Sequence, residues 1–321
     1  MWRYSSLLPQ LPVLVSKGEG LTPITRIEGV LVKNERLNPT GSYADRASAV
    51  ISSYVKSRGL RALRVVYEPG FARSISYYLG DHVKATYCLE DAVSVDVEEL
   101  FDVAERGELS TCGSGEGEVV DYASALVVEG LKTIVFEIVE RGLSVDYIVA
   151  PAKTGVLAYS LAKGLGELEE SGLDVSIEVI AVHLKKSPPP LSPRDRRVRF
   201  IGVSQDEFLE SFRLLVKKGV YTAPLSAMGF HVARSLERAV AVLTVGYRTR
   251  PKRRRRWLTE KIIRALEELG KATAYEVWRN IPEASLRGVY KAIKSLVAEG
   301  VVCEEPSTRG RRKIMLYKLC S

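Results

Sequence analysis

Residues 33–46 read Lys33-Asn34-Glu35-Arg36-Leu37-Asn38-Pro39-Thr40-Gly41-Ser42-Tyr43-Ala44-Asp45-Arg46. Ser42 and Tyr43 supply hydroxyl groups, and Asp45 and Arg46 supply opposite charges. Ala44 stands between them with a methyl group. A methyl group can neither bond covalently to an aldehyde nor move a proton. Position 44 therefore supplies no amine for covalent catalysis.

The stretch resembles the signature of the threonine synthase branch of fold-type II pyridoxal-phosphate (PLP) enzymes. In that family Asn-Pro-Thr-x-Ser-Phe precedes the lysine that binds PLP covalently, and Ala44 stands at the lysine position. The segments 18–23 and 242–246 resemble two further elements of the family. The resemblance implies an α/β, two-lobed, tryptophan synthase β-like fold with parallel sheets over 1–247, the smaller lobe covering roughly 46–125.

Apolar segments alternate in the way that this fold requires. Segments 63–67 and 83–87 read as strands, and 72–79 between them reads as a helix. The family resemblance implies another helix over 129–138, ahead of a strand at 146–151. Such alternation builds a parallel sheet.

The loops that hold PLP in the family differ in this chain. Segment 68–71 reads Glu-Pro-Gly-Phe in place of Ser-Ser-Gly-Asn, so a negative charge replaces a hydrogen-bonding amide. Segment 151–155 reads Pro-Ala-Lys-Thr-Gly, and a helix that begins there could bind a phosphate or carboxylate, unless Lys153 simply faces solvent. The resemblance implies a pseudoenzyme without a catalytic residue, in which any PLP is held non-covalently. It places ligand-binding residues at Ser42, Tyr43, Lys153, Thr154, Gly155 and Thr244.

Other charged positions leave alternatives open. Asp45 and Arg46 fit either a contact with a substrate or a structural ion pair under a helix start. Lys33 and Lys153 are the amines that a PLP enzyme would need in place of the missing lysine.

Positive charge is concentrated at the C-terminal end. Segment 250–321 holds 18 Lys and Arg against 8 Asp and Glu, whereas 1–249 holds 29 against 31. A segregated basic module is typical of nucleic-acid binding, because neutralising phosphates releases condensed counterions. Within it, the run at 248–256 reads as a flexible basic linker.

The rest of this segment predicts three helices and two strands. Apolar residues at helical spacing predict a helix over 258–269, and Thr273 with Glu276 forms the N-terminal signature of a second. A third helix is expected over 285–300, followed by strands at 301–303 and 314–317 around a basic turn. The pattern resembles a winged helix-turn-helix over 257–321.

The winged-helix resemblance implies that the third helix enters the major groove and that the basic turn reaches the phosphates or the minor groove. The DNA-binding residues would be Ser285, Arg287, Tyr290, Lys291, Lys294, Arg309, Arg311 and Arg312. The alternative is that this domain mediates protein contacts.

Cysteine and histidine usage indicates neither a metal site nor a disulfide framework. The cysteines at 88, 112, 303 and 320 form no Cys-x-x-Cys pair, and the chain has three histidines. No segment predicts a signal peptide or a membrane span, so the sequence favours a cytoplasmic protein without a membrane partner. Few Asn and Gln beside many charged residues suggest a thermophilic origin.

These features predict a DNA-binding transcriptional regulator. Its inactive threonine synthase-like domain would bind an effector, either an amino acid, a phosphorylated amino acid or PLP, and the protein would act as a homodimer on DNA. The alternative is a PLP-dependent lyase or synthase of the threonine synthase family with an appended DNA-binding domain.

Overall fold

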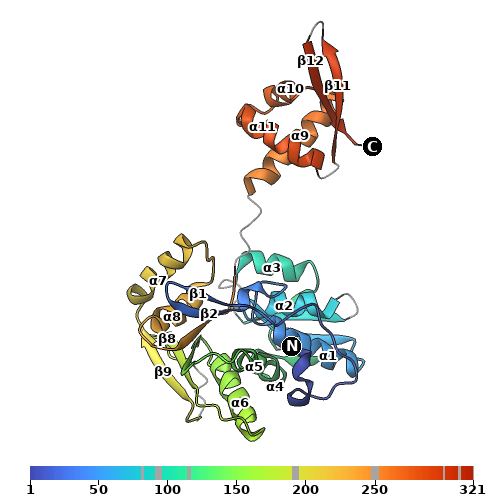
Figure 1. The fold of residues 1–321 in the computed structure, drawn as a ribbon. Coiled ribbons are helices and arrows are strands. Elements are labelled where there is room, and N and C mark those ends of the chain that lie inside the picture. Colours follow the sequence, from blue (N-terminus) through green and yellow to red (C-terminus); the bar gives the residue numbers. More distant parts are fainter. Residues whose placement is uncertain are drawn as a thin grey trace. The chain divides into compact units, whose positions relative to one another are not determined.

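The computed structural model describes residues 1–80, 83–90, 96–113, 117–189, 195–246, 253–298, 301–309 and 312–320. The chain forms two compact units, Met1–Arg248 and Thr249–Ser321, both drawn in Figure 1. In the described part of the chain, no helix is both long enough and apolar enough to span a bilayer.

The larger sheet of the first unit has six strands in the order β1-β2-β10-β7-β8-β9. All neighbours are parallel except β1 and β2, which are antiparallel. Every residue of β10 is buried, as expected for a central parallel strand that is covered on both faces. The strands are β1 (Ile24–Ile27), β2 (Val30–Asn34), β7 (Tyr147–Pro151), β8 (Glu178–Leu184), β9 (Val198–Val203) and β10 (Ala239–Leu243).

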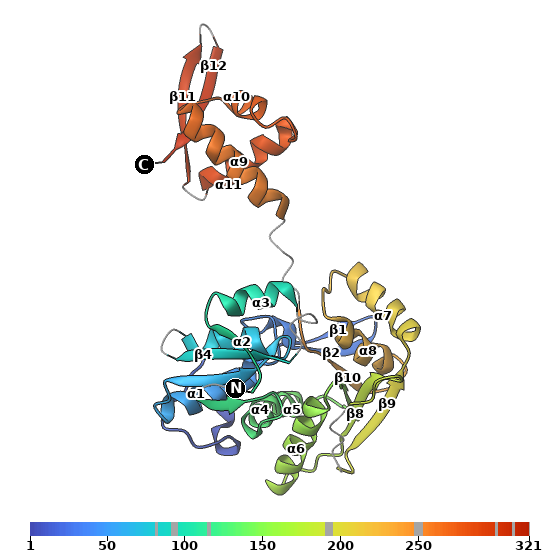
Figure 2. The same ribbon diagram turned by 180° about the vertical axis from the view of Figure 1, so that it is seen from behind.

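The smaller sheet has four parallel strands in the order β5-β4-β3-β6. They are β3 (Ala62–Val66), β4 (Lys84–Leu89), β5 (Glu108–Thr111) and β6 (Glu118–Val120). Helix α2 (Phe71–Leu79) connects β3 to β4. The two strands and the intervening helix predicted over 63–87 are therefore confirmed, with ends shifted by one or two residues. Figure 2 shows β4 and β10, one from each sheet, from behind.

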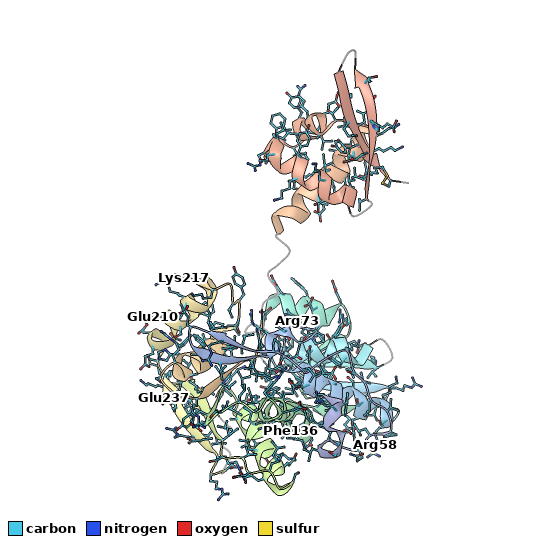
Figure 3. All side chains as sticks on the ribbon, in the orientation of Figure 1. Arg58, Arg73, Phe136, Glu210, Lys217 and Glu237 are labelled. Atoms are coloured by element: carbon cyan, nitrogen blue, oxygen red, sulfur yellow. A yellow bond between two sulfur atoms is a disulfide. The ribbon has the colours of Figure 1, made fainter. Side chains whose placement is uncertain are left out.

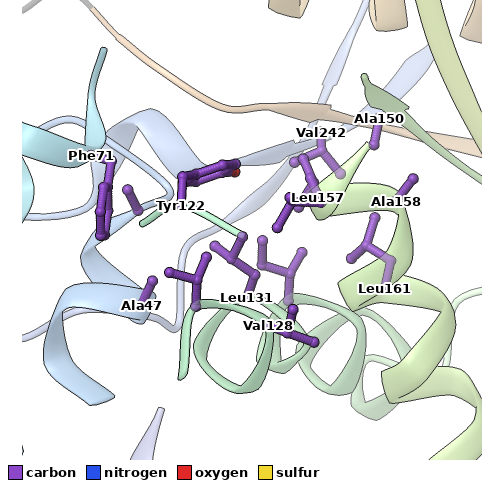
Figure 4. Packing of buried hydrophobic residues seen from close by; sticks show 14 of the residues in the cluster. Ala47, Phe71, Tyr122, Val128, Leu131, Ala150, Leu157, Ala158, Leu161 and Val242 are labelled. Atoms are coloured by element: carbon purple, nitrogen blue, oxygen red, sulfur yellow. The ribbon is translucent and has the colours of Figure 1, made fainter. Parts of the chain in front are cut away.

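Further helices complete the first unit and enclose a continuous apolar core. The helix predicted over 129–138 is two helices, α4 and α5, which meet at Lys132. Figure 4 shows Ala47, Val128, Leu131, Leu161 and Val242 packed together in this core. The helices are α1 (Asp45–Ser57), α3 (Val97–Ala104), α4 (Ala125–Leu131), α5 (Thr133–Glu140), α6 (Val156–Glu170), α7 (Gln205–Lys217) and α8 (Pro224–Ala233), and the short 3-10 segments are η1 (Trp2–Leu7) and η2 (Glu35–Leu37).

A buried network of four charges fixes the segment around Ala44. Arg46 donates to both oxygens of Glu35, at 2.7 and 2.8 Å, and to both oxygens of Glu137, at 2.7 and 2.8 Å. Lys33 donates to Glu137 at 2.5 Å. All four side chains are at most 3% exposed. Because each positive charge faces carboxylates, the network can stay ionised in the interior.

Of the two alternatives for Asp45 and Arg46, an ion pair between these neighbours is wrong. Adjacent helical residues point in different directions, so Asp45 turns away from Arg46. Its carboxylate accepts the backbone N–H of Thr40 at 2.7 Å and the hydroxyl of Ser74 at 2.6 Å. Asp45 therefore ties the start of α1 to α2.

The described residues of the second unit form three helices and a two-stranded antiparallel sheet. They are α9 (Arg253–Leu269), α10 (Ala274–Arg279), α11 (Leu286–Ala298), β11 (Val302–Arg309) and β12 (Arg312–Leu319). Thr273 and Glu276 form the predicted capping box of α10. Helix α9 begins at Arg253, inside the segment expected as a linker, and arginine is a good helix former. Residues 247–252 lie outside the described part.

The hairpin differs from the prediction in two ways. Its strands are longer than expected, and Pro306 lies within β11, opposite Met315. Each strand of a two-stranded sheet is an edge strand, where a residue without an N–H is tolerated. Cys303 and Cys320 also form a disulfide, which Figure 3 shows in yellow. The expectation of no disulfide is wrong here, because strand pairing brings together two cysteines that lie 17 residues apart.

Candidate functional site

A cavity of about 220 Å³ lies at the carboxyl ends of strands from both sheets of the first unit. Residues that follow β3, β7 and β10 form its wall, the place where open α/β sheets bind ligands. The lining residues include Tyr43, Glu68, Gly70, Arg73, Asp96, Glu99, Tyr122, Lys153, Thr154, Gly155, Thr244 and Val245.

The cavity brings together five of the six ligand-binding residues predicted in this unit. Tyr43, Lys153, Thr154, Gly155 and Thr244 line it. Ser42 does not belong to the lining. Its side chain is buried, and its hydroxyl accepts the backbone N–H of Ala44 at 3.1 Å. Ser42 therefore shapes the loop behind the cavity.

Ala44 is fully buried and packs in the apolar core. Its methyl group is not among the groups that line the cavity. No nucleophile or base is therefore offered to the cavity from this position.

Two helices point their N-termini toward the cavity, and each is preceded by a left-handed glycine. Gly70 precedes α2 with φ of 80°, and Gly155 precedes α6 with φ of 86°. A side chain at Gly70 would also lie 3.3 Å from both Ser42 Oγ and Val245 Cγ2. Glycine is therefore needed at Gly70 for conformation and for space.

The N-terminus of α2 already holds an anion from the chain itself. Glu99, on α3, accepts the N–H of Gly70 at 2.8 and 2.9 Å and the N–H of Arg73 at 2.8 Å. Burial raises the pKa of Glu99, and the backbone N–H groups of Gly70 and Arg73 oppose that rise. The carboxylate thus fills a helix N-terminus, where negative charge is most favourable. Arg73, in the first turn of α2, is labelled in Figure 3.

Sequence reasoning missed Glu99. Asp96 accepts the N–H of Glu99 at 3.0 Å and forms the N-cap of α3. An acidic residue three positions after an N-cap is typical of an ordinary capping box. The spacing of Asp96 and Glu99 is that of a capping box within α3, but the side chain of Glu99 binds the N-terminus of α2 instead.

One ion pair spans the cavity. Lys153, after β7, lies 2.6 Å from Glu68, after β3, so the pair joins the strand ends of the two sheets. The two side chains are 53% and 25% exposed. Lys153 therefore lines the cavity and is also half exposed.

Two aromatic side chains, Tyr43 and Tyr122, form another part of the cavity wall. The hydroxyls of Tyr43 and Tyr122 are hydrogen-bonded to each other. Phe71 contacts Tyr122 edge to face, with ring centroids 5.7 Å apart, and both rings are labelled in Figure 4. Burial raises the pKa of both tyrosines above the ordinary value, so both hydroxyls stay neutral.

Thr244 lies at the end of β10, and its hydroxyl is 2.9 Å from the hydroxyl of Ser226. Ser226 also accepts the N–H of Thr244 at 3.0 Å. The threonine is thus held by α8, and it is one of the residues that line the cavity.

These residues do not fit PLP bound through a lysine. Ala44 offers no amine, and Lys33 is held in the buried network, where it also donates to the carbonyl of Thr22 at 2.7 Å. Lys153 does line the cavity, but its ammonium is paired with Glu68. The carboxylates of Glu68 and Glu99 line the same cavity and oppose an anionic cofactor.

The sequence matches no protein-family model and no curated protein. Solved structures with a similar fold include a fungal L-serine ammonia-lyase from Rhizomucor miehei, a serine racemase from Dictyostelium discoideum and the processed form of threonine deaminase isoform 2 from Solanum lycopersicum. Their identities with this chain are 17%, 15% and 12%, and their TM-scores are 0.58, 0.58 and 0.56. They cover 71%, 70% and 78% of this chain and 94%, 92% and 93% of their own. At such identities the likeness shows the fold, which is the two-sheet α/β fold of fold-type II PLP enzymes.

The second unit exposes polar residues along one side of α11. Arg287, Tyr290, Lys291 and Lys294 are exposed, whereas Val289, Ile293 and Leu296 are buried in the core of the unit. Ser285 precedes the helix, and its hydroxyl accepts the N–H of Gly288 at 3.1 Å. Ser285 therefore caps the helix.

Two of the three arginines predicted to bind DNA from the hairpin lie at its tip. Arg309 ends β11, Arg312 begins β12, and the two are paired in the ladder. Arg311 lies outside the described residues. Among the residues that the structure describes, no three His, Cys, Asp or Glu side chains gather as a metal site would require.

Proposed function

We propose that this protein is a DNA-binding transcriptional regulator whose second unit is a winged helix-turn-helix and whose first unit binds a small effector. The observation that carries the proposal is the exposed face of α11. It presents Arg287, Tyr290, Lys291 and Lys294, while the opposite face holds α11 in the core. A helix of this kind can enter the major groove and contact base edges and phosphates.

The first unit supports the effector role. Its cavity holds charged and hydroxyl groups at the strand ends but receives no amine from Ala44. We propose that it derives from the threonine synthase branch of its fold and binds a metabolite without transforming it. The candidate ligands are an amino acid, a phosphorylated amino acid or PLP held non-covalently.

The mechanism that we propose is thermodynamic linkage in a homodimer. Two copies place two winged helices on inverted half-sites, whose spacing the dimer fixes. An effector that binds one conformation of the first unit more tightly changes the affinity for DNA, and DNA changes the affinity for the effector by the same factor.

The test is selection of genomic fragments by the full-length protein at near-physiological salt, followed by sequencing. Enrichment of a few sites with inverted half-sites is expected. Retention without sequence preference would refute a specific regulator, and no retention would refute DNA binding altogether.

Variants then locate the reading surface. Arg287→Ala or Lys291→Ala is expected to weaken binding to an enriched site by about 1–3 kcal/mol if the residue contacts a base. Lys217→Ala, on the exposed end of α7 (Figure 3), removes one positive charge from the first unit and serves as the matched control. Equal losses in all three variants would show that only net charge matters.

A further inference from the structure

Helix α7 has one buried face and one exposed face. Phe208, Ser211 and Leu215 are buried and hold the helix on the first unit. The exposed face, which we call the outer face of α7, consists of Asp206, Leu209, Glu210, Arg213, Val216 and Lys217. Figure 3 labels Glu210 and Lys217 on this face.

The outer face of α7 repeats one arrangement with the charge reversed. Its first half reads acid, apolar, acid at positions 206, 209 and 210, and its second half reads base, apolar, base at positions 213, 216 and 217. The second half follows the first by seven residues, which is about two helical turns. The two halves therefore lie one above the other, and each carries one sign of charge.

Within the part of the chain that the structure describes, the charged side chains of the outer face form no hydrogen bond or ion pair. By contrast, Glu207 of α7 is paired with Lys185, and Lys218 at its end is paired with Glu28. Like charges four residues apart on a helix repel each other, and the outer face holds two such pairs, 206 with 210 and 213 with 217. A single copy of the chain compensates these charges with no ion pair.

The helix dipole accounts only for the ends of the pattern. It favours acids in the first turn and bases in the last turn, and its effect fades within one turn. Asp206 and Lys217 lie in those turns, whereas Glu210 and Arg213 lie in the middle of the helix. The order of the two middle charges therefore needs another explanation.

An antiparallel copy of the same helix complements the outer face. A two-fold axis near residue 212 brings Glu210 opposite Arg213 of the second copy, and Leu209 opposite Val216 of the second copy. Each contact forms twice, because a two-fold interface uses the same surface of both copies. A parallel copy would instead place acid against acid and base against base. Asp206 and Lys217 meet at the rim, where a single charge contributes little.

We infer that the outer face of α7 is the contact between two copies of this chain, packed antiparallel about a two-fold axis. The inference rests on the homodimer of the proposed function and names its surface. Leu209 and Val216 supply the apolar contact, and the charges of Glu210 and Arg213 fix the register and the orientation.

The experiment measures the dissociation constant of the full-length dimer by sedimentation equilibrium. Glu210→Arg and Arg213→Glu each replace two attractions per dimer by two repulsions, and each is expected to raise the constant at least about tenfold. Both changes in one chain exchange the partners and should restore the parent value to within about threefold. Leu209→Asp should also raise the constant at least about tenfold, because it puts a charge into the apolar contact.

A mixture of the two single variants tests the pairing directly. In the mixed dimer every reversed charge faces an opposite charge, so the heterodimer should form more tightly than either homodimer. Glu237→Arg is the control for charge, since Glu237, labelled in Figure 3, is exposed and lies outside α7. Leu173→Asp is the control for the apolar change, because Leu173 is 49% exposed and Leu209 is 46% exposed. Both controls should leave the constant within about twofold of the parent value.

The outcomes separate this inference from the proposed function. A parent protein that stays monomeric, single variants that dissociate no more than the controls, or a mixture without preferred heterodimers would each overturn the inference. If all variants stay dimeric and still select inverted half-sites, the inference fails and the regulator proposal stands with a different contact. If the variants behave as expected but the protein retains no DNA, the regulator proposal fails and the contact stands.

Discussion

Glu137→Gln is expected to destabilise the first unit strongly, because it removes one of two negative charges from the buried network. Glu137 accepts from Lys33, from both terminal nitrogens of Arg46 and from the N–H of Leu21 at 2.8 Å. In the variant, Glu35 is the remaining carboxylate of this network and must balance both Lys33 and Arg46. The Nζ of Lys33 lies 3.8 Å from Glu35.

The expected magnitude can be worked from the pKa of Glu137. Burial raises that pKa, but the hydrogen bonds and charges of Arg46 and Lys33 outweigh burial and lower it from 4.5 to about 2. Each unit of pKa shift corresponds to about 1.4 kcal/mol, so the ionised carboxylate of Glu137 contributes about 3 kcal/mol to the free energy of unfolding. This agrees with the roughly 3–5 kcal/mol lost when one member of a buried ion pair is removed. Because the folded pKa is lowered, the contribution is complete above pH 4.5 and is lost as the pH falls toward 2.

The assay is guanidinium denaturation at neutral pH, followed by hydrogen exchange of peptides from α1 and β2, since the two units can unfold separately. Glu178→Gln is the matched control, because its pair with Arg199, at 2.8 Å, is exposed. The free energy of unfolding of the control should fall by less than about 1 kcal/mol. Adding Lys33→Met to Glu137→Gln should recover part of the loss, since it restores charge balance. Equal losses in Glu137→Gln and the control would refute the reasoning.

Three further predictions concern other parts of the structure. Burial raises the pKa of Asp45 to about 6. The folded state therefore favours the protonated carboxyl group, which contributes fully to stability at low pH, and the melting temperature should fall as the pH rises from about 4 to 6. The profile of melting temperature against pH in Asp45→Asn should lack that fall, and an unchanged profile would contradict the assignment. Gly70→Ala should cost more than Gly172→Ala in denaturant titrations, because both glycines have positive φ, at 80° and 89°, but only Gly70 has neighbours within 4 Å of an added Cβ; equal costs of about 1 kcal/mol would show that crowding is negligible. Cys320→Ser should destabilise the second unit by about 3 kcal/mol, because it opens the loop closed by the bond to Cys303; calorimetry of the oxidised protein measures the change, and an unchanged transition would show that the bond does not form in solution.

Much of the first unit could be predicted because its signals are local. The strand–helix–strand order at 62–89 follows from apolar runs broken by Gly70 and Gly80, and such patterns depend little on the rest of the chain. Residues after β7 and β10 could likewise be placed at one cavity, because parallel strands end on the same edge of a sheet.

The features that could not be predicted depend on contacts between distant segments. Glu99 shares a helix with its N-cap but binds the start of another helix, 29 residues away. The disulfide of the hairpin depends on the register of β11 and β12, and the predicted strands 301–303 and 314–317 are too short to show that register. Asp45 and Arg46 are neighbours in sequence, yet each finds its partners in a different element.

The tethered carboxylate of Glu99 has a consequence for how the cavity responds to its surroundings. A group fixed to the same chain has a high effective concentration at its binding site, often in the millimolar range or above. Inorganic phosphate, sulfate and chloride must compete with it at α2, and salt screens buried charges only weakly. The negative charge beside Gly70 is therefore set by the fold, and it is insulated from background anions in the surrounding solution.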